Sequence, residues 1–499
     1  MPPQSLNQLF QSALQAHQSN QINTAIELYH QVLEIFPNHI NASINLGIAL
    51  CHQQKTDDAI KLLEQTVSIS KENYHLALYN YGTALLLNHQ DQAKTVNIFL
   101  QLYSQEPDNN DIHYKLAVAL LQNSEFRDAL NHLKILTAKE PKNSLFLKEM
   151  AFIYEQLGEF KTGLETIKQA HQLSPDNINI QLNYSIALLR LGFFELAWPL
   201  YESRLIIEQK KYGDKTRLFS TPSWKGESLQ QKTLLIHGEQ GLGDNIQYLR
   251  FFPLIKSLGA NIIFICPYEI ALLIKNNPLI DQLISPKKPT IKFEIQPSQI
   301  PHDYQTPLMS IPFALSLKQQ KTPPPCKNIQ TLKNFKTRIS IPTTPLLKVG
   351  LCWRGNPKHS NDRNRSIHIS KLQTLSTLAN IRFYSLQFQP QNNELAQFSD
   401  NIVDLGSTVN NMAETAHYIN SLDLIISVDT SICHLAGTLG KAVWILLPFC
   451  SDWRWLTKTS ETFWYPTAKL FRQRTYNCWD TAIEDIKQHL EIENEKVSL

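Results

Sequence analysis

Three segments in the second half of the chain carry residue types suited to binding a small anionic ligand. In the first, Gly238, Gly241 and Gly243 let the backbone approach a ligand closely and adopt positive φ angles. Asp244 opens the predicted helix that follows, where its simplest role is that of an N-cap. The spacing G-x-x-G-x-G matches neither the dinucleotide fingerprint nor the P-loop, which requires Gly-Lys-Ser/Thr. The glycines therefore indicate close approach of a ligand without identifying it.

The second segment is strongly basic. Residues 353–366 contain Arg354, Lys358, Arg363 and Arg365, directly after a predicted strand. Guanidinium groups match phosphate oxygens in a bidentate fashion, so the segment predicts a diphosphate clamp at the carboxyl end of that strand. The alternative is a solvated basic loop.

The third segment is a predicted strand-to-helix turn at Asp429 and Thr430, followed by Ser431 and His434. The free N–H groups of a helix start form a natural anion site. A carboxylate beside a phosphate is unfavourable, so Asp429 is expected to bind sugar hydroxyls or to orient the backbone. Its alternative role is again that of an N-cap.

These segments need parallel strands to hold them. Apolar runs predict strands at 233–237, 261–266, 348–353, 382–387, 424–428 and 442–447, with helices at 245–258, 370–379, 431–439 and 479–491. Residues 286–345 hold 11 of the 26 prolines and predict loops around short strands and then a linker. Two α/β units result, and we expect a ligand cleft between them, at the carboxyl ends of the strands.

The first two hundred residues show an internal repeat. Small residues recur in steps of 34, 34, 36, 34 and 34, at Ala25, Ala59, Ala93, Ala129, Gly163 and Ala197. Prolines follow at Pro37, Pro107, Pro141 and Pro175. The pattern predicts helix pairs in which the small residue permits close packing and the proline ends the second helix. A generic helical bundle would not explain a sustained 34-residue period.

This pattern resembles the tetratricopeptide repeat (TPR) family over residues 6–205, as six helix pairs. Carrying the resemblance are Asn45-Leu46-Gly47, Tyr81-Gly82, Tyr29 and Tyr201. The second repeat departs from the pattern, with Lys71 in place of the closing proline. The resemblance implies a curved array whose inner groove binds a protein or peptide.

Asparagines could line that groove. Asn45, Asn80 and Asn183 share one position in the first helix of their repeats, and in O-GlcNAc transferases asparagines at this position hold a peptide backbone. Lys115 and Glu149 interrupt the series here. The alternative is that the asparagines only cap or solvate the inner face.

Together, the three segments resemble the family 9 glycosyltransferases, the bacterial heptosyltransferases, and most closely their TPR-fused bacterial members. The matches cover about residues 222–475: Gly243-Asp244 with Pro253, the Asp-Thr-x-x-x-His-x-Ala run at 429–436, and the tail segments 448–455 and 464–466. The resemblance implies a GT-B fold and an inverting transfer.

By this resemblance, Asp244 would be the catalytic base that deprotonates an acceptor hydroxyl. Thr430, Ser431 and His434 would hold the diphosphate of a nucleotide-sugar, and Arg365 stands where the family has a lysine. Further contacts to the donor would come from Arg354, Asp429, Asp452 and Arg454. Three tryptophans would either stack on the ligand or form part of the core: Trp453, Trp455 and Trp464. The resemblance implies no metal ion and no cofactor; the nucleotide-sugar is a co-substrate.

Composition limits the partners. The 499 residues are 42% hydrophobic and 18% charged, with a formal net charge of +3. This small net charge argues against non-specific electrostatic binding to nucleic acid or to an anionic membrane. Nothing approaches a run of about 18 apolar residues, and the first residues do not resemble a signal peptide. Seven cysteines without a C-x-x-C pair favour reduced thiols. We therefore expect a cytoplasmic protein without a membrane span.

The predicted fold class is α + α/β. A TPR α-solenoid (6–205) precedes a GT-B fold of two doubly wound, Rossmann-like halves, at 222–340 on the acceptor side and 346–475 on the nucleotide-sugar side, and a C-terminal helix and tail (476–499). The predicted function is an inverting glycosyltransferase whose repeats recruit a protein acceptor or partner. The alternatives are a non-catalytic TPR scaffold with a degenerate GT-B domain, and a protein glycosyltransferase like the O-GlcNAc transferases, whose catalytic motifs are not seen here.

Overall fold

The computed structural model describes residues 6–212, 219, 221–287, 300–317, 338–359, 361–391, 393–399 and 402–498. More than half of the proline-rich segment 286–345, including Cys326, lies outside these residues. The described chain divides into two compact units, Met1–Ser174 and Pro175–Leu499, and each is described by itself.

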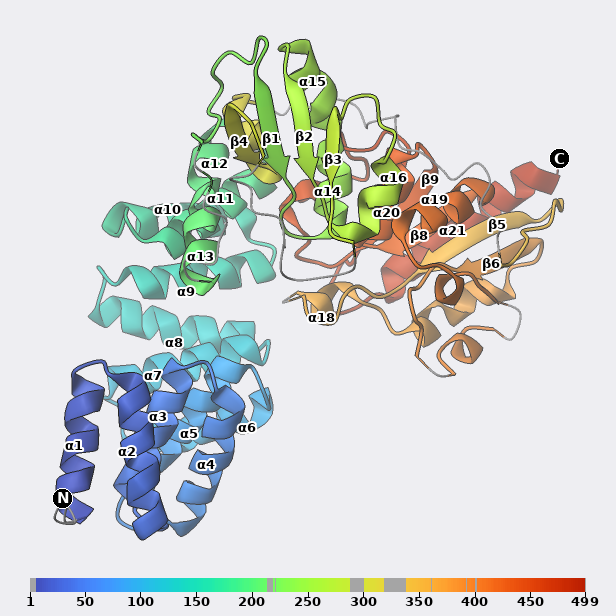
Figure 1. The fold of residues 1–499 in the computed structure, drawn as a ribbon. Helices are drawn as coiled ribbons and strands as arrows, with labels where there is room; N and C mark the ends of the chain where they lie inside the picture. Colours follow the sequence, from blue (N-terminus) through green and yellow to red (C-terminus); the bar gives the residue numbers. More distant parts are fainter. Residues whose placement is uncertain are drawn as a thin grey trace. The chain divides into compact units, whose positions relative to one another are not determined.

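The first unit is a stack of helix pairs (Figure 1). Its helices are α1 (Leu6–Gln18), α2 (Ile22–Ile35), α3 (Ile40–His52), α4 (Thr56–Ile69), α5 (Tyr74–Asn88), α6 (Gln92–Gln105), α7 (Asn110–Gln122), α8 (Phe126–Lys139), α9 (Ser144–Gln156) and α10 (Phe160–Leu173). The helices α2, α6 and α8 each end two residues before a proline, at Pro37, Pro107 and Pro141, which confirms the predicted helix ends.

The 36-residue step was predicted one repeat too late. The second helices of the pairs begin at Ile22, Thr56, Gln92, Phe126 and Phe160, so the long step separates α4 from α6. Ala93 is exposed, and Thr95 takes the buried position that Ala59 and Ala129 occupy in their repeats. The two extra residues lie in α5, which has 15 residues where α3 and α7 have 13.

Two glycines allow the helices of a pair to approach. A Cβ atom on Gly47 would lie 2.7 Å from Leu63, and one on Gly82 would lie 2.8 Å from Ile98. The aromatic positions are filled as expected in the first repeat, where Tyr29 is fully buried. The Leu-Gly pattern in the sequence is therefore explained by helix-to-helix distance.

The second unit begins with three more helices, α11 (Ile178–Arg190), α12 (Phe194–Tyr201) and α13 (Ser203–Tyr212). A parallel four-stranded sheet follows, in the order β3-β2-β1-β4. Its strands are β1 (Thr233–His237), β2 (Asn261–Ile265), β3 (Gln282–Ile284) and β4 (Tyr304–Pro307). The accompanying helices are α14 (Leu242–Tyr248), η2 (Leu249–Phe251), α15 (Phe252–Ser257), α16 (Tyr268–Ile274), η4 (Leu308–Ser310) and α17 (Ile311–Ala314), so the single helix predicted at 245–258 is broken into three.

A parallel six-stranded sheet completes the unit, in the order β10-β9-β8-β5-β6-β7. Its strands are β5 (Leu347–Cys352), β6 (Ile381–Ser385), β7 (Val403–Asp404), β8 (Leu424–Val428), β9 (Ala442–Leu447) and β10 (Ala468–Arg472). The helices are α18 (Asp362–Arg365), η6 (Ile369–Thr377), η7 (Leu395–Gln397), η8 (Gly406–Thr408), α19 (Met412–Ser421), α20 (Ser431–Thr438), η9 (Trp453–Trp455) and α21 (Asp480–Ser498). The helix predicted at 370–379 is 3-10 in form.

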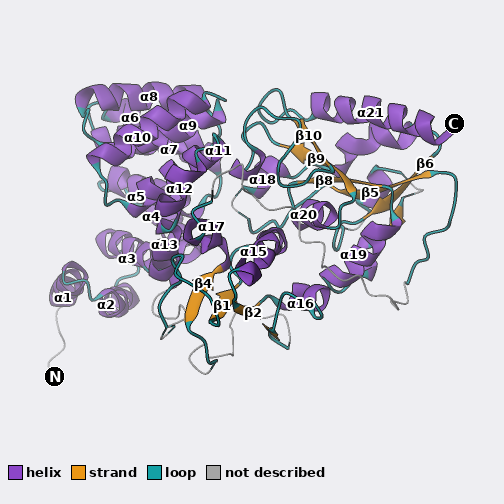
Figure 2. Ribbon diagram, turned by 90° about the horizontal axis from the view of Figure 1, so that it is seen from above, coloured by secondary structure: helices purple, strands orange, loops and turns teal. Residues whose placement is uncertain are grey.

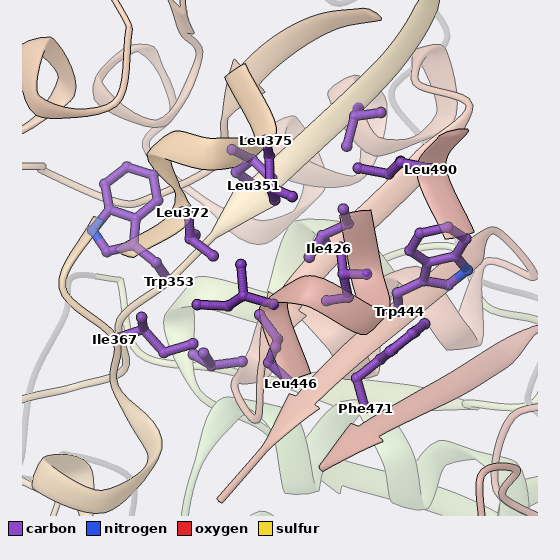
Figure 3. Packing of buried hydrophobic residues seen from close by; sticks show 14 of the residues in the cluster. Leu351, Trp353, Ile367, Leu372, Leu375, Ile426, Trp444, Leu446, Phe471 and Leu490 are labelled. Atoms are coloured by element: carbon purple, nitrogen blue, oxygen red, sulfur yellow. The ribbon is translucent and has the colours of Figure 1, made fainter. Parts of the chain in front are cut away.

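Helices cover both faces of this second sheet, with α21 on one side and α19 and α20 on the other (Figure 2). On the α21 face, Leu351, Ile426 and Leu446 project from three neighbouring strands. They pack with Trp353, Trp444 and residues of α21 and η6 in one apolar cluster (Figure 3). Burial of both faces explains why the strands read as continuous apolar runs in the sequence.

No helix within the described ranges is long and apolar enough to cross a membrane.

The sixth helix pair, α11 with α12, groups with the sheets and not with the first five pairs. The indole N–H of Trp198 donates to the carbonyl of Leu317, at 3.0 Å. The rings of Phe194, Trp198 and Tyr201 lie 5.8–6.3 Å from that of Trp453. This pair therefore packs on η9 and on α17 with the residues after it, as part of the second unit.

Replacing Trp198 with alanine should lower the free energy of unfolding of the second unit by about 3–5 kcal/mol, because a buried aromatic contact and a hydrogen bond are lost. Urea titration followed by tryptophan fluorescence measures this, since all eight tryptophans lie in that unit. Leu196→Ala, at a highly exposed position of the same helix, is the control and should change stability by less than about 0.5 kcal/mol. Equal effects of the two substitutions would contradict this packing.

Candidate functional site

The three predicted segments lie at points where the strand order of each sheet reverses. In the first sheet the order reverses between β1 and β4, and in the second between β5 and β8. The glycine-rich segment follows β1, the basic segment follows β5, and the Asp-Thr turn follows β8. Ligands of parallel α/β sheets bind at such topological switch points. The topology therefore gives all three segments positions suited to ligand binding.

The glycine-rich segment starts α14 differently from the prediction. Gly241 is the N-cap, and Asp244, three residues on, accepts a hydrogen bond from the N–H of Gly241 through Oδ2, at 2.9 Å. Asp244 thus takes the third position of a capping box. The predicted positive φ angles are wrong for these glycines; Gln240 has the positive φ, at 56°.

The other two glycines allow the backbone to pack closely against neighbouring side chains. A Cβ on Gly238 would lie 2.3 Å from Oδ1 of Asn245. A Cβ on Gly243 would lie 2.6 Å from Cδ2 of His434, the histidine of the third segment. Glycine at 243 therefore allows the start of α14 to contact α20, which brings the first and third segments together.

In the third segment, Thr430 is the N-cap of α20; its hydroxyl accepts from the N–H of Ile432, so the prediction of Asp429 as a cap is wrong. Asp429 instead faces His434, with 3.7 Å between Oδ1 and Nε2. The other imidazole nitrogen, Nδ1, is 2.9 Å from the hydroxyl of Tyr465. The hydroxyl and the carboxylate together orient the ring within the buried turn.

Burial sets the protonation of this turn. It raises the pKa of Asp429 to about 6, with the nearby carboxylate of Asp452 acting in the same direction. It lowers the pKa of His434 to about 3, helped by the guanidinium of Arg454. The imidazole is therefore neutral at physiological pH and can act as a hydrogen-bonding group toward a ligand.

The basic segment is less concentrated than predicted. Arg365 does reach the third segment, donating from Nη1 to the carbonyl of Asp429 at 3.0 Å, and it also pairs with Asp362 at 3.2 Å. Arg354 instead pairs with Glu394, at 3.1 Å. The predicted diphosphate clamp of Arg354, Lys358, Arg363 and Arg365 therefore stays a prediction; of its arginines, Arg365 contacts the Asp-Thr turn and Arg354 is held by Glu394.

Arg454 joins the two sheets. Its Nη2 lies 2.5 Å from Oδ1 of Asp244, in the first segment, and its Nη1 lies 2.9 Å from Oδ1 of Asp452, its own neighbour after β9. Its Nε donates to Oε1 of Gln247, at 2.8 Å. Of the predicted donor-pocket residues, Arg454 thus contacts Asp244 directly, and Asp452 is bound to Arg454.

The tryptophans near this arginine are packing residues. Trp453, Trp455 and Trp464 are each at most 3% exposed. Trp455 stacks on the ring of His434, with centroids 5.4 Å apart. Trp464 donates its indole N–H to the carbonyl of Arg454, at 2.9 Å. Core packing, and not ligand stacking, explains these side chains.

A second buried ion pair supports the glycine-rich segment, and the sequence pattern did not predict it. Arg204 donates to Glu239 at 2.8 Å and to Ser310 at 2.8 Å, and it pairs with Glu202 at 2.6 Å. Glu239 lies within the segment, and its carbonyl accepts from Nδ2 of Asn245 at 3.0 Å. A glutamate inside a glycine-rich turn could have indicated a buried ion pair, but the sequence does not show that its partner is Arg204, 35 residues away.

One group in the described part of the chain has side chains suited to a metal ion. Ligand atoms of Asp429, Cys433 and His434 lie within 4.8 Å of one another. The guanidinium groups of Arg454 and Arg365 act on the same imidazole and disfavour positive charge there. These fixed guanidinium charges would repel a metal ion, although the carboxylate of Asp452 acts in the opposite direction.

The asparagine series is divided between the units. Asn45 and Asn80 each donate Nδ2 to the carbonyl four residues earlier, at 2.9 and 2.8 Å. Asn183 belongs to the second unit. In the first two asparagines the local bond orients the side chain and leaves the carbonyl oxygen as the acceptor for a peptide N–H.

Comparisons with known proteins bear on the first unit. Two family models described as tetratricopeptide repeat match residues 16–81 and 114–178. The N-terminal helix pairs are tetratricopeptide repeats. Such repeats are protein-interaction modules, so the array supports binding of a protein or peptide.

The curated relatives are distant. Protein FlbA of Caulobacter vibrioides is 22% identical over 479 residues, which is 89% of this chain and 71% of FlbA. The BBSome complex member BBS4 homolog of Drosophila melanogaster is 21% identical, over 36% of this chain and 37% of that protein. Protein O-mannosyl-transferase TMTC3 of Homo sapiens is 27% identical, over 27% of this chain and 15% of its own length.

Among solved structures, MamA is 20% identical and covers 34% of this chain and 97% of its own, with a TM-score of 0.31. YrrB, whose structure is described as that of a TPR protein with an unusual peptide-binding site, is 16% identical and covers 35% of this chain and 90% of its own, with a TM-score of 0.31.

The raised pKa of Asp429 predicts a pH-dependent stability. The folded protein binds the proton of Asp429 more tightly than the unfolded chain, so this residue destabilises the fold increasingly as the pH rises from about 4 to about 6. The free energy of unfolding of Asp429→Asn, relative to that of the unmodified protein, should rise over this range by up to about 3 kcal/mol and stay level above pH 7. Urea titrations at several pH values measure it. A difference that does not change with pH would contradict the prediction.

Proposed function

We propose that this protein is an inverting glycosyltransferase that moves a sugar from a nucleotide-diphosphate donor to an acceptor hydroxyl. The observation that carries the proposal is the convergence of the predicted segments. Asp244, from the first sheet, lies against Arg454 and, through Gly243, beside His434 of the second sheet. A base and an anion-binding helix start, each at a topological switch point, are what such a transfer requires.

In this proposal Asp244 accepts the proton of the acceptor hydroxyl as its oxygen attacks the anomeric carbon of the donor. The bond from that carbon to the diphosphate breaks, and the diphosphate leaves with the bonding electrons. Oδ1 of Asp244 is the oxygen for this proton, because Oδ2 holds the N–H of Gly241. One carboxylate suffices for inversion, since the acceptor attacks directly.

The leaving diphosphate would meet the start of α20. The N–H groups of a helix start and its dipole stabilise negative charge. Ser431 begins the helix, Thr430 caps it, and neutral His434 adds a hydrogen-bonding group. Arg365, beside the carbonyl of Asp429, supplies positive charge. These groups stabilise the developing charge without a metal ion or cofactor.

More specifically, we propose a GT-B fold like that of the family 9 glycosyltransferases. The first sheet would lie on the acceptor side and the second on the donor side. Two parallel sheets with their predicted segments at switch points support it. Similarity to a protein O-mannosyl-transferase hints at glycosyl transfer in general and not at this family, and the shared segment is only 15% of that enzyme. Six free cysteines among the described residues fit a cytoplasmic location.

The repeats would recruit a protein acceptor or a partner. The alternative, a scaffold without turnover, would leave Asp244 with only its capping and ion-pair roles. The two functions differ in whether donor is consumed, and the following substitution distinguishes them.

Asp244→Asn should lower the rate of sugar transfer, or of slow donor hydrolysis, by about 10²–10⁴-fold, because the general base is lost while donor binding is retained. A radiolabelled donor assay measures transfer, after thermal-shift screening of nucleotide-sugars has identified a donor. Asp303→Asn, in an exposed ion pair with Lys232 at the edge of the same sheet, is the control and should keep full activity. Full activity of Asp244→Asn would remove it as the base, and binding of no nucleotide-sugar would favour the scaffold.

The asparagine hypothesis has its own test. Asn45→Ala/Asn80→Ala, both in the first unit, should weaken binding of a recruited protein by about tenfold or more, since two backbone hydrogen bonds are lost. These side chains are partly exposed, so the melting temperature should change little. Affinity capture of partners, followed by titration of the captured partner, measures both quantities. Unchanged binding would show that the asparagines only solvate the inner face.

A further inference from the structure

Arg454 is a buried cation that faces more negative charge than it can neutralise. Only 7% of its side chain is exposed, and it contacts the carboxylates of both Asp244 and Asp452. These carboxylates are more exposed, at 18% and 37%. The open side of the cluster is therefore the carboxylate side, and a guanidinium shared in this way can exchange one anion for another.

The fold would keep Arg454 in place if its bond to Asp244 were broken. Asp452, Gln247 and the face of the Trp453 ring, 4.4 Å from the guanidinium carbon, would still hold the side chain. Asp244 would also keep its position, because Oδ2 still accepts from the N–H of Gly241. The Arg454–Asp244 contact is thus a bond that neither partner needs for its own placement.

The contact lies beside the anion-binding turn. Trp455, the residue after Arg454, stacks on His434, and Gly243, the residue before Asp244, packs against the same imidazole. Arg454 also acts electrostatically on both His434 and Asp429. A diphosphate at the start of α20 would therefore be a neighbour of the guanidinium, with two phosphate groups to compete against one carboxylate.

We propose that Arg454 exchanges partners: it pairs with Asp244 in the donor-free protein and turns to the diphosphate of a bound nucleotide, which frees Oδ1 of Asp244 to accept the acceptor proton. This inference rests on the proposed function and adds to it an order in which donor and acceptor are engaged. Donor binds first, and only then is the base available, so Asp244 is not free to activate an acceptor hydroxyl or water while the donor site is empty.

The test is a double-mutant cycle on nucleotide binding, which requires no acceptor. UDP, GDP, ADP and CDP are titrated calorimetrically into the full-length protein, and the tightest binder is the probe. Asp244→Asn removes the competing anion and should tighten binding of the probe by about tenfold, or about 1.4 kcal/mol. Arg454→Met should weaken it by at least about tenfold, and adding Asp244→Asn to Arg454→Met should then change nothing. Asp303→Asn is the charge-matched control and should bind as the unmodified protein does.

The outcomes separate the two proposals. If Asp244→Asn binds the probe no more tightly than the unmodified protein, or if its effect persists in the Arg454→Met background, the exchange of partners is wrong while the donor site stands. If none of the four nucleotides binds either the unmodified protein or Asp244→Asn, the donor site itself is wrong, and the proposed function falls with it. Should Arg454→Met fail to fold, Arg454→Lys replaces it; its single point charge should reduce the effect of Asp244→Asn severalfold.

Discussion

A buried guanidinium must be matched by carboxylates, and Arg454 finds one on each of the two sheets of the second unit. Asp244 follows β1 and Asp452 follows β9, so the guanidinium lies between the glycine-rich segment and the segment after β9. Leaving such a charge unpaired costs several kcal/mol, so this point of the site requires anions, either the two carboxylates or a carboxylate and a bound diphosphate. The absence of a side chain at Gly243 is the matching steric condition, because any Cβ there would clash with His434.

The same principle operates where the start of α13, directly after the sixth helix pair, meets the segments that follow β1 and β4. Arg204 is buried between Glu202 and Glu239, and Glu239 is part of the segment that carries Asp244. Aromatic rings of α12 also surround Trp453, whose neighbour is Arg454. The sixth pair, by repeat length the last unit of the array, thus acts as a support for the candidate site. A repeat pattern marks a helix pair, but the surfaces to which it packs depend on its outer residues.

The chemistry of the site follows from how its charges are already used. Arg354 pairs with Glu394 and Arg365 with Asp362, so the charge of both arginines is partly offset before a ligand binds. Burial keeps His434 neutral and raises the pKa of Asp429 to about 6. Hydrogen bonding, the helix start and an exchangeable guanidinium, more than a concentration of positive charge, are therefore the means by which this site would bind a diphosphate.

The sequence by itself determined the repeat length, the helix ends before prolines, and most strands, including β1, β8 and β9 to the residue, because periodicity and proline geometry are local. It also identified the segments that the sheet topology gathers. It placed the long repeat step wrongly, because Ala93 and Thr95 are both small and only packing shows which is buried. It missed β3, β7 and β10, which are short or at sheet edges, and the partners of Arg204, Arg354 and Arg454. The pairings with Glu239, Glu394 and Asp244 join residues 35 to 210 positions apart, a separation over which only the tertiary structure decides which charges meet.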